Sequence, residues 1–242
     1  MKVEPGLSGS SKPISAARNS TAARSVLPRL LLQVRNCDAC AGRLPLGPRP
    51  VLQIGESARL LIIGQAPGSR AHASGIPWSD RSGDELPRWL DLPAEVFYDS
   101  SCVAILPMGF CYPGRGVSGD LPPRHECAGL WHHRLLAQMP GISLTLLVGR
   151  YAQRRYLGPD SVGLTAAMQS WRARAPGVML LPHPSPRNRG WFARNPWFEA
   201  ELLALLRERV RRLGLRLQGD QSASEALEVG GGGGLVAAGD GR

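Results

Sequence analysis

Four short apolar runs alternate with segments of mixed polarity through the middle of the chain. Each run has four or five residues with almost no polar position, and Gly, Pro or another turn residue lies at its boundary. Short, continuous apolar runs are typical of strands that are buried on both faces, as in a parallel sheet. The predicted strands are Leu60–Ile63, Val103–Leu106, Leu144–Val148 and Val178–Leu181.

Helical patterns fill the segments around these strands. The predicted helices are Val26–Val34, Glu85–Leu90, Glu126–Gln138, Arg150–Leu157 and Pro196–Leu213. The last begins with Pro in its first turn and ends in arginines, which suit a helix C-terminus. Alternation of strands and helices predicts an α/β fold with three layers, α/β/α, around a central four-stranded parallel sheet. In such folds the ligand crevice lies at the carboxyl ends of the strands.

Composition divides the chain into one domain and two tails. Residues 1–24 are rich in Ser, Gly, Ala and Pro, and residues 218–242 are polar and then Gly-rich. Such segments lack the apolar surface for a core, so we expect both to be disordered. The remaining residues, 25–217, have an ordinary size for a single domain.

Charge and cysteine content limit the classes of partner and compartment. The formal net charge of +10 favours a polyanionic partner, although a general preference for arginine codons gives the same number. The longest apolar runs are too short to span a bilayer, so we expect no membrane association. Five cysteines without a secretory signal indicate a reducing compartment, and we expect a cytoplasmic protein.

Four of the cysteines form one close pair and one distant pair. These are Cys37-x2-Cys40 and Cys111-x15-Cys127. In a reducing compartment this spacing favours metal binding over disulfides, because four thiolates can surround one soft metal centre. An iron–sulfur cluster and a zinc ion both accept such a set of ligands.

A Gly- and Pro-rich turn, GQAPG at Gly64–Gly68, directly follows the first predicted strand. Backbone N–H groups of such a turn can face a ligand. The next loop carries Trp78, Asp80 and Asp84, which a loop buries with difficulty. The alternative is that Trp78 packs beneath the loop and that Asp80 or Asp84 caps the following helix.

A second motif, HPSPRN at His183–Asn188, follows the last predicted strand. Prolines on both sides restrict His183, and a fixed imidazole suits stabilisation of an anion that develops during a reaction. Cations and aromatics alternate after it, as in many nucleic-acid grooves. The alternative is a solvated basic loop whose aromatics pack against the last helix. This alternating set is Arg187, Arg189, Trp191, Phe192 and Arg194.

With both motifs, the Trp-containing loop and the cysteine spacing, the chain resembles the uracil-DNA glycosylase superfamily over nearly all of its predicted domain. It is most similar to the iron–sulfur branches known as families four and five. The resemblance implies an enzyme that flips a base out of DNA and hydrolyses its N-glycosidic bond. We therefore expect a monomeric DNA-repair glycosylase that acts on uracil or another deaminated base, at the bacterial nucleoid.

The resemblance also implies the ligands of the metal centre. Cys37, Cys40, Cys111 and Cys127 would hold a structural [4Fe–4S] cluster, with zinc as the alternative. Cys102 would be the spare thiol, buried near its strand.

Roles in catalysis follow from the same resemblance. Trp78 would stack on the flipped base, and His183 would donate a hydrogen bond to uracil O2 as the base leaves. The turn Gln65–Gly68, which includes Pro67 and Gly68, would lie beside the sugar and hold the attacking water. Arg187 would enter the gap that the base leaves, and Ser185, Asn188 and Arg189 would contact the DNA backbone.

The sequence departs from the family pattern at two positions. The first motif offers neutral Gln65 where most active members carry an acid or Asn, so Asp80 becomes the expected general base. Pro107 stands where an Asn usually reads uracil, and proline has no side-chain hydrogen bond to offer. The alternative function is therefore a weak or inactive family member that acts as a metal-stabilised module binding DNA or a base.

Overall fold

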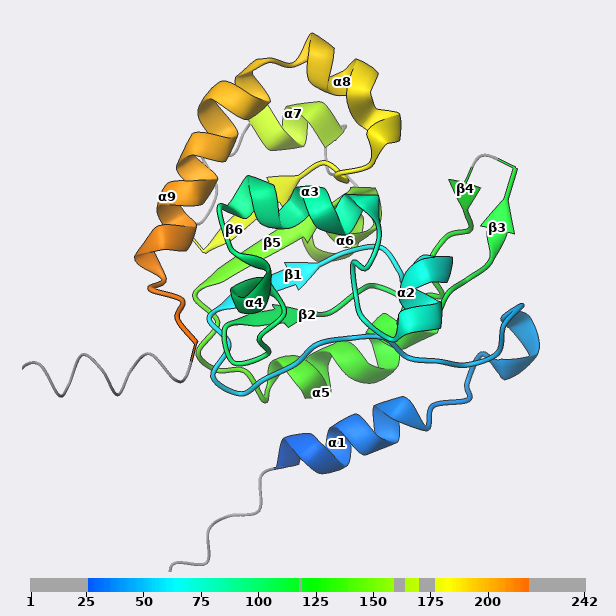
Figure 1. The fold of residues 1–242 in the computed structure, drawn as a ribbon. Coiled ribbons are helices and arrows are strands. Elements are labelled where there is room, and N and C mark those ends of the chain that lie inside the picture. Colours follow the sequence, from blue (N-terminus) through cyan, green and yellow to red (C-terminus); the bar gives the residue numbers. More distant parts are fainter. Residues whose placement is uncertain (1–25, 118, 159–163, 170–176, 218–242) are drawn as a thin grey trace, which may run out of the picture.

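All four predicted apolar runs form strands of one parallel sheet. The strands are β1 (Leu60–Ile63), β2 (Val103–Ile105), β5 (Leu144–Val148) and β6 (Val178–Leu181), in the order β2-β1-β5-β6. Our computed structural model describes residues 26–117, 119–158, 164–169 and 177–217, and within them helices cover both faces of the sheet (Figure 1). The predicted fold class is confirmed. The predicted tails, residues 1–24 and 218–242, lie outside the described residues.

Successive residues of each strand enter two different cores. Leu60 and Ile62 pack in one core with Trp89, and Leu61 and Ile63 pack in the other with Leu135. All four residues of β1 are buried, since side chains alternate across the sheet and both faces are covered. This two-sided burial is the physical reason for the continuous apolar runs in the sequence.

Helices surround the sheet at positions close to those predicted. The α-helices are α1 (Val26–Arg35), α2 (Ser69–Ser74), α3 (Arg81–Leu90), α4 (Ala94–Phe97), α5 (His133–Leu136), α6 (Arg150–Leu157), α7 (Leu164–Gln169), α8 (Arg189–Arg194) and α9 (Ala204–Arg212). Two π-helical segments, η2 (Ala128–His132) and η5 (Phe198–Leu203), precede α5 and α9, and 3₁₀ turns lie at η1 (Ala41–Arg43) and η4 (Pro186–Asn188). No helix among the described residues is long and apolar enough to cross a membrane.

Helix α3 begins earlier than the periodicity predicted because Asp80 caps it. Asp80 Oδ1 accepts hydrogen bonds from the backbone N–H groups of Ser82 (2.9 Å) and Gly83 (3.1 Å). These are two of the donors that the first turn of a helix leaves unsatisfied. The capping alternative is therefore correct for Asp80, whereas Asp84 lies within the first turn.

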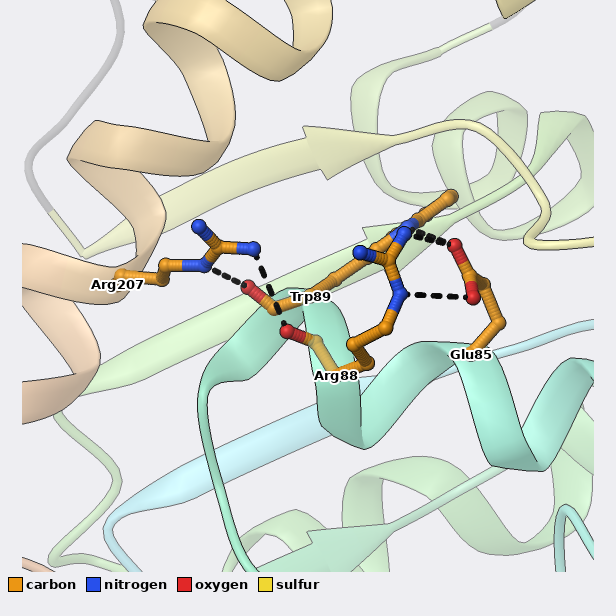
Figure 2. A network of polar contacts seen from close by, with 4 residues as sticks. All are labelled: Glu85, Arg88, Trp89 and Arg207. Carbon is orange, nitrogen blue, oxygen red and sulfur yellow. Dashed lines mark hydrogen bonds and ion pairs between the residues drawn. The ribbon is translucent and has the colours of Figure 1, made fainter.

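The last helix, α9, is fixed to α3 by a guanidinium group. Arg207 donates to the backbone carbonyls of Trp89 (3.3 Å) and Arg88 (3.5 Å), and Glu85 accepts hydrogen bonds from Arg88 and from the Trp89 indole (Figure 2). Arg207 thus binds the carboxyl end of α3.

A short hairpin and four short α-helices, α2, α4, α7 and α8, were missed by the sequence analysis. Strands β3 (Arg115–Gly116) and β4 (Gly119–Asp120) pair antiparallel and project beside α2, beyond the carboxyl ends of the sheet (Figure 1). Strands of two residues and helices such as α2 and α4 are too short to show a period of 2 or 3.6 residues.

Candidate active site and cysteine cluster

A cavity of about 600 Å³ lies at the carboxyl ends of the strands. Its walls come from the turns that follow β1, β5 and β6, from the loop before α3 and from the β3–β4 hairpin. The volume is in the range of pockets that enclose a small molecule. The cavity therefore lies at the carboxyl ends of the parallel strands, as the predicted α/β topology indicated.

Trp78 and His183 meet in this cavity, although they belong to different loops. Their ring centroids are 5.3 Å apart and the ring planes are inclined by 35°. Trp78 has φ of +58°, which a bulky side chain adopts only where its surroundings enforce it. Tyr98 contributes to this, because its hydroxyl donates to the Trp78 carbonyl at 3.3 Å.

Two glycines leave room for this conformation of Trp78. A Cβ on Gly64 would lie 2.9 Å from Cζ2 of the indole, and a Cβ on Gly83 would lie 1.4 Å from the Trp78 carbonyl oxygen. The first glycine of GQAPG thus lets the indole lie against the end of β1. Glycine is required at Gly83 because backbone occupies the space of a side chain.

His183 is half-buried, and its loop is held from inside. The Asn188 amide donates to the His183 carbonyl at 2.7 Å. Burial lowers the pKa of His183, and the nearby Asp80 carboxylate opposes this only in part. The imidazole is therefore neutral at neutral pH, the state in which it can donate a hydrogen bond without bringing a positive charge.

The other predicted residues of the first motif also line the cavity. Gln65, Pro67 and Gly68 lie in its wall, and the Gln65 amide reaches the carbonyl of Leu121 at 3.5 Å, the long limit of a hydrogen bond. Asp80 lines the same wall, with Oδ1 engaged in the helix cap and Oδ2 3.7 Å from the place of a Cβ on Gly68.

The second motif surrounds the mouth of the cavity on the other side. Ser185, Arg187 and Asn188 line it, and Ser185 Oγ accepts a hydrogen bond from the backbone N–H of Arg187 at 3.3 Å. Arg189 is exposed at the start of α8 and is not part of the lining. The structure brings together all the predicted catalytic and base-binding residues, while their roles stay predictions.

Three residues of the lining were missed as functional candidates. Arg150 and Tyr151 follow β5, and the Arg150 guanidinium lies 4.8 Å above the Tyr151 ring and donates to its hydroxyl at 2.8 Å. The sequence could have indicated both residues as part of the site, because they directly follow a predicted strand. The third, Asp120, comes from the β3–β4 hairpin and had no such signal.

The four predicted metal ligands line one small pocket. Cys37, Cys40, Cys111 and Cys127 surround it together with Arg124. The backbone N–H of Phe110 lies 3.4 Å from Cys127 Sγ, and Arg124 contacts Cys40. Burial raises the pKa of the Cys127 thiol to about 12, so burial alone disfavours the thiolate there.

All five cysteines are free thiols, and the four in this pocket share it without a disulfide. Four thiolates are a donor set that an iron–sulfur cluster and a zinc ion both accept. Within the described residues no three His, Cys, Asp or Glu side chains are arranged to hold one metal ion. Cys102 lies apart and buried, as predicted, with Sγ 3.1 Å from the Arg216 carbonyl oxygen.

An ion pair joins the two halves of the cysteine cluster. Glu126 accepts from Arg43 at 2.5 Å and from Arg124 at 3.2 Å. Arg43 follows Cys40 closely, and Glu126 directly precedes Cys127. This contact holds the N-terminal pair of cysteines against the distant pair.

The family model of the uracil DNA glycosylase superfamily matches residues 52–207. This match covers more than half of the chain. The chain belongs to this superfamily. Membership supports a DNA glycosylase type of function with DNA as the substrate. The matched residues include Cys111 and Cys127 but begin after Cys37 and Cys40, so the family match is independent of the complete cysteine cluster.

Proposed function

We propose that this superfamily member is a DNA-repair glycosylase that flips uracil, or another deaminated base, into the cavity and hydrolyses its N-glycosidic bond. The observation that carries the proposal is the meeting of Trp78 and His183 in one cavity, 5.3 Å between ring centroids. An aromatic face and a neutral imidazole are what a flipped pyrimidine needs for stacking and for hydrogen bonding.

Electrostatic stabilisation of the leaving base is the main catalytic contribution of His183. As the N-glycosidic bond breaks, its electron pair moves onto the base, and negative charge develops on the uracil O2. A positioned hydrogen-bond donor in a water-poor cavity stabilises that charge more than water does. The lowered pKa of His183 supports this role, because a neutral donor remains available across neutral pH.

The attacking water would bind at the wall of the cavity that the GQAPG turn forms. Asp80 and Gly68 lie in this wall. Oδ1 of Asp80 accepts the hydrogen bonds of the helix cap, and Oδ2 takes no part in the cap. In this proposal Asp80 orients the attacking water against the anomeric carbon, beside Gln65. Binding energy from Ser185, Arg187, Asn188 and Arg189 on the DNA backbone offsets the cost of base flipping.

We propose that the cysteine pocket binds a [4Fe–4S] cluster, with zinc as the alternative. The ligands would be Cys37, Cys40, Cys111 and Cys127. The four thiols line one pocket, three of them buried and Cys37 half-buried, and a backbone N–H group lies near Cys127 Sγ; both observations support it. Such a cluster supplies structural cross-linking and needs no redox step on the base. It would hold the loop that carries the β3–β4 hairpin next to the cavity. A cluster at this site would support the proposal that the protein is a member of the iron–sulfur branches of the superfamily.

A base-excision panel tests the function. Duplex and single-stranded oligonucleotides with one uracil, hypoxanthine or xanthine are incubated with the full chain, and abasic sites are cleaved with alkali. We expect excision of at least one base, and a loss of about 10²–10³-fold in His183→Ala with DNA affinity retained. Tight duplex binding without excision of any base would instead support the alternative, a binding module. Because Pro107 lines the cavity without a side-chain donor, the panel extends beyond uracil.

A further inference from the structure

A second carboxylate faces the same side of the cavity as Asp80. Asp120, on β4, lies in the cavity wall, and its Oδ2 is 3.6 Å from the place of a Cβ on Gly68. Oδ2 of Asp80 is 3.7 Å from that same place. Because Gly68 has no side chain, the position where a Cβ would lie is open, and the two carboxylates flank it. This is the turn at which the attacking water is proposed to lie.

The two carboxylates differ in what else they hold. Oδ1 of Asp80 accepts two backbone hydrogen bonds at the start of α3, so this group is bound to the helix and its orientation is fixed. Asp120 is on a short, exposed hairpin, opposite the second motif. A Cβ on Gly119 would lie 2.2 Å from an Nη atom of Arg187, so the hairpin and the HPSPRN loop are in direct contact at the cavity mouth.

Asp120 is exposed as a residue, but its carboxyl group lies in the cavity wall and is partly desolvated. This desolvation raises its pKa most, Arg187 and Arg115 lower it, and Asp80 raises it again. The net effect is a pKa above the usual value for aspartate. A carboxylate with a raised pKa is a stronger base once ionised.

We propose that Asp120, in place of the general base expected at Asp80, is a catalytic residue that takes the proton of the attacking water beside Gly68, while Asp80 orients that water. This inference rests on the proposed glycosylase function. The water oxygen bonds to the anomeric carbon and its proton passes to Asp120. The N-glycosidic bond breaks, its electron pair leaves with the base, and the base anion takes up a proton from solvent.

Single-turnover kinetics on the best substrate of the base panel, measured across pH, test the assignment. We expect Asp120→Asn to lower the rate of the chemical step by about 10²-fold or more with unchanged DNA affinity, and Asp120→Glu to restore part of it. The rate of the unaltered protein falls as pH falls through the pKa of Asp120. In Asp80→Asn this acid limb moves to lower pH, because the neighbouring negative charge is gone, even though the maximal rate is reduced.

Asp91→Asn is the matched control, since Asp91 is exposed at the end of α3 and outside the cavity lining. If Asp120→Asn retains the rate within about threefold while His183→Ala loses it, Asp120 is not the base and the glycosylase function stands. An acid limb that stays in place in Asp80→Asn also overturns the assignment. Absence of excision by the unaltered protein overturns the proposed function and this inference together. Thermal unfolding of each variant separates a misfolded hairpin from a lost base.

Discussion

The indole of Trp78 contacts the imidazole of His183 in the wall of the cavity, with 5.3 Å between the ring centroids, although more than a hundred residues separate them in the chain. The contact depends on the parallel arrangement of β1 and β6, whose carboxyl ends open on the same edge of the sheet. Base recognition and charge stabilisation in the proposed reaction both depend on this one pair.

Trp78 should determine how tightly the flipped base is held. Trp78→Ala removes the stacking surface, and stacking of a base on an aromatic side chain is worth about 1–3 kcal/mol. We expect kcat/KM for the excised base to fall about 5- to 150-fold, and Trp78→Phe to retain most of it. Steady-state kinetics on the oligonucleotide measure this effect.

The matched control for Trp78 is Trp131→Phe, because Trp131 lies on η2 and is not in the cavity lining. An unchanged kcat/KM in Trp78→Ala would remove the indole from base binding. It would leave His183 as the single member of the pair with a role.

Two glycines should have separable effects. Gly64→Ala forces the indole aside, because its Cβ would lie 2.9 Å from Trp78 Cζ2, so we expect reduced activity and a nearly unchanged melting temperature. In Gly83→Ala the new Cβ would lie 1.4 Å from the Trp78 carbonyl oxygen. This clash is with the backbone, so a side-chain rotation cannot relieve it. For this variant we expect loss of stability by about 2 kcal/mol or more.

Thermal denaturation and the excision assay, run on the same samples, distinguish the two effects. Gly129→Ala is the control, since a Cβ there meets nothing within 4 Å and lies in helical backbone. Alanine should stabilise that position by about 0.5–1 kcal/mol. Equal destabilisation by Gly64→Ala and Gly83→Ala would show that Gly64 serves the fold rather than the site.

Stability should decline on mild acidification because of a buried histidine. His132 is stacked on Phe110 and lies between the Tyr156 hydroxyl (2.7 Å) and the Pro107 carbonyl (3.0 Å), and burial lowers its pKa to about 4. Between the ordinary histidine pKa, about 6.5, and about 4 the unfolded chain binds a proton that the folded protein does not. The folded state thus loses about 3 kcal/mol as pH falls through this window.

Urea denaturation at pH 7.5 and pH 4.5 measures this loss. His132→Gln is expected to reduce the pH dependence while lowering stability at pH 7.5, since it disturbs two hydrogen bonds. His133→Gln is the control, because His133 is the next residue and is exposed. A pH dependence that is the same in His132→Gln and in the unaltered protein would contradict the assignment of the buried neutral imidazole.

Loss of the proposed metal centre should loosen the hairpin more than the sheet. Cys40→Ser and Cys111→Ser are expected to lose bound iron and the brown colour of a [4Fe–4S] cluster, and to lower the melting temperature. Cys102→Ser serves as the comparison, because Cys102 lies outside the cysteine pocket. Metal analysis of the purified protein decides between iron and zinc. Full metal content in both cluster variants would exclude these thiols as ligands.

Local patterns were sufficient for the strands and for most of the longer helices. The prediction of Leu60–Ile63, Leu144–Val148, Val178–Leu181 and Arg150–Leu157 agrees with the structure residue for residue. The strand at Val103 ends one residue early. The helix predicted from Glu126 begins there but ends two residues early, the helix predicted from Pro196 begins one residue later, and both contain π-helical turns. Backbone hydrogen bonding sets such ends, and hydrophobic periodicity does not report it.

By itself the sequence determined the sheet, the edge at which the cavity opens and most of the residues that line it. This was possible because burial on both faces leaves an apolar run, and because motifs directly after such runs lie at one edge of a parallel sheet. Only the tertiary structure decided that Asp80 caps α3, that Trp78 has a positive φ and that Asp120 approaches Gly68. Contacts between loops leave no periodic trace along the chain, because they depend on where the completed core holds each loop.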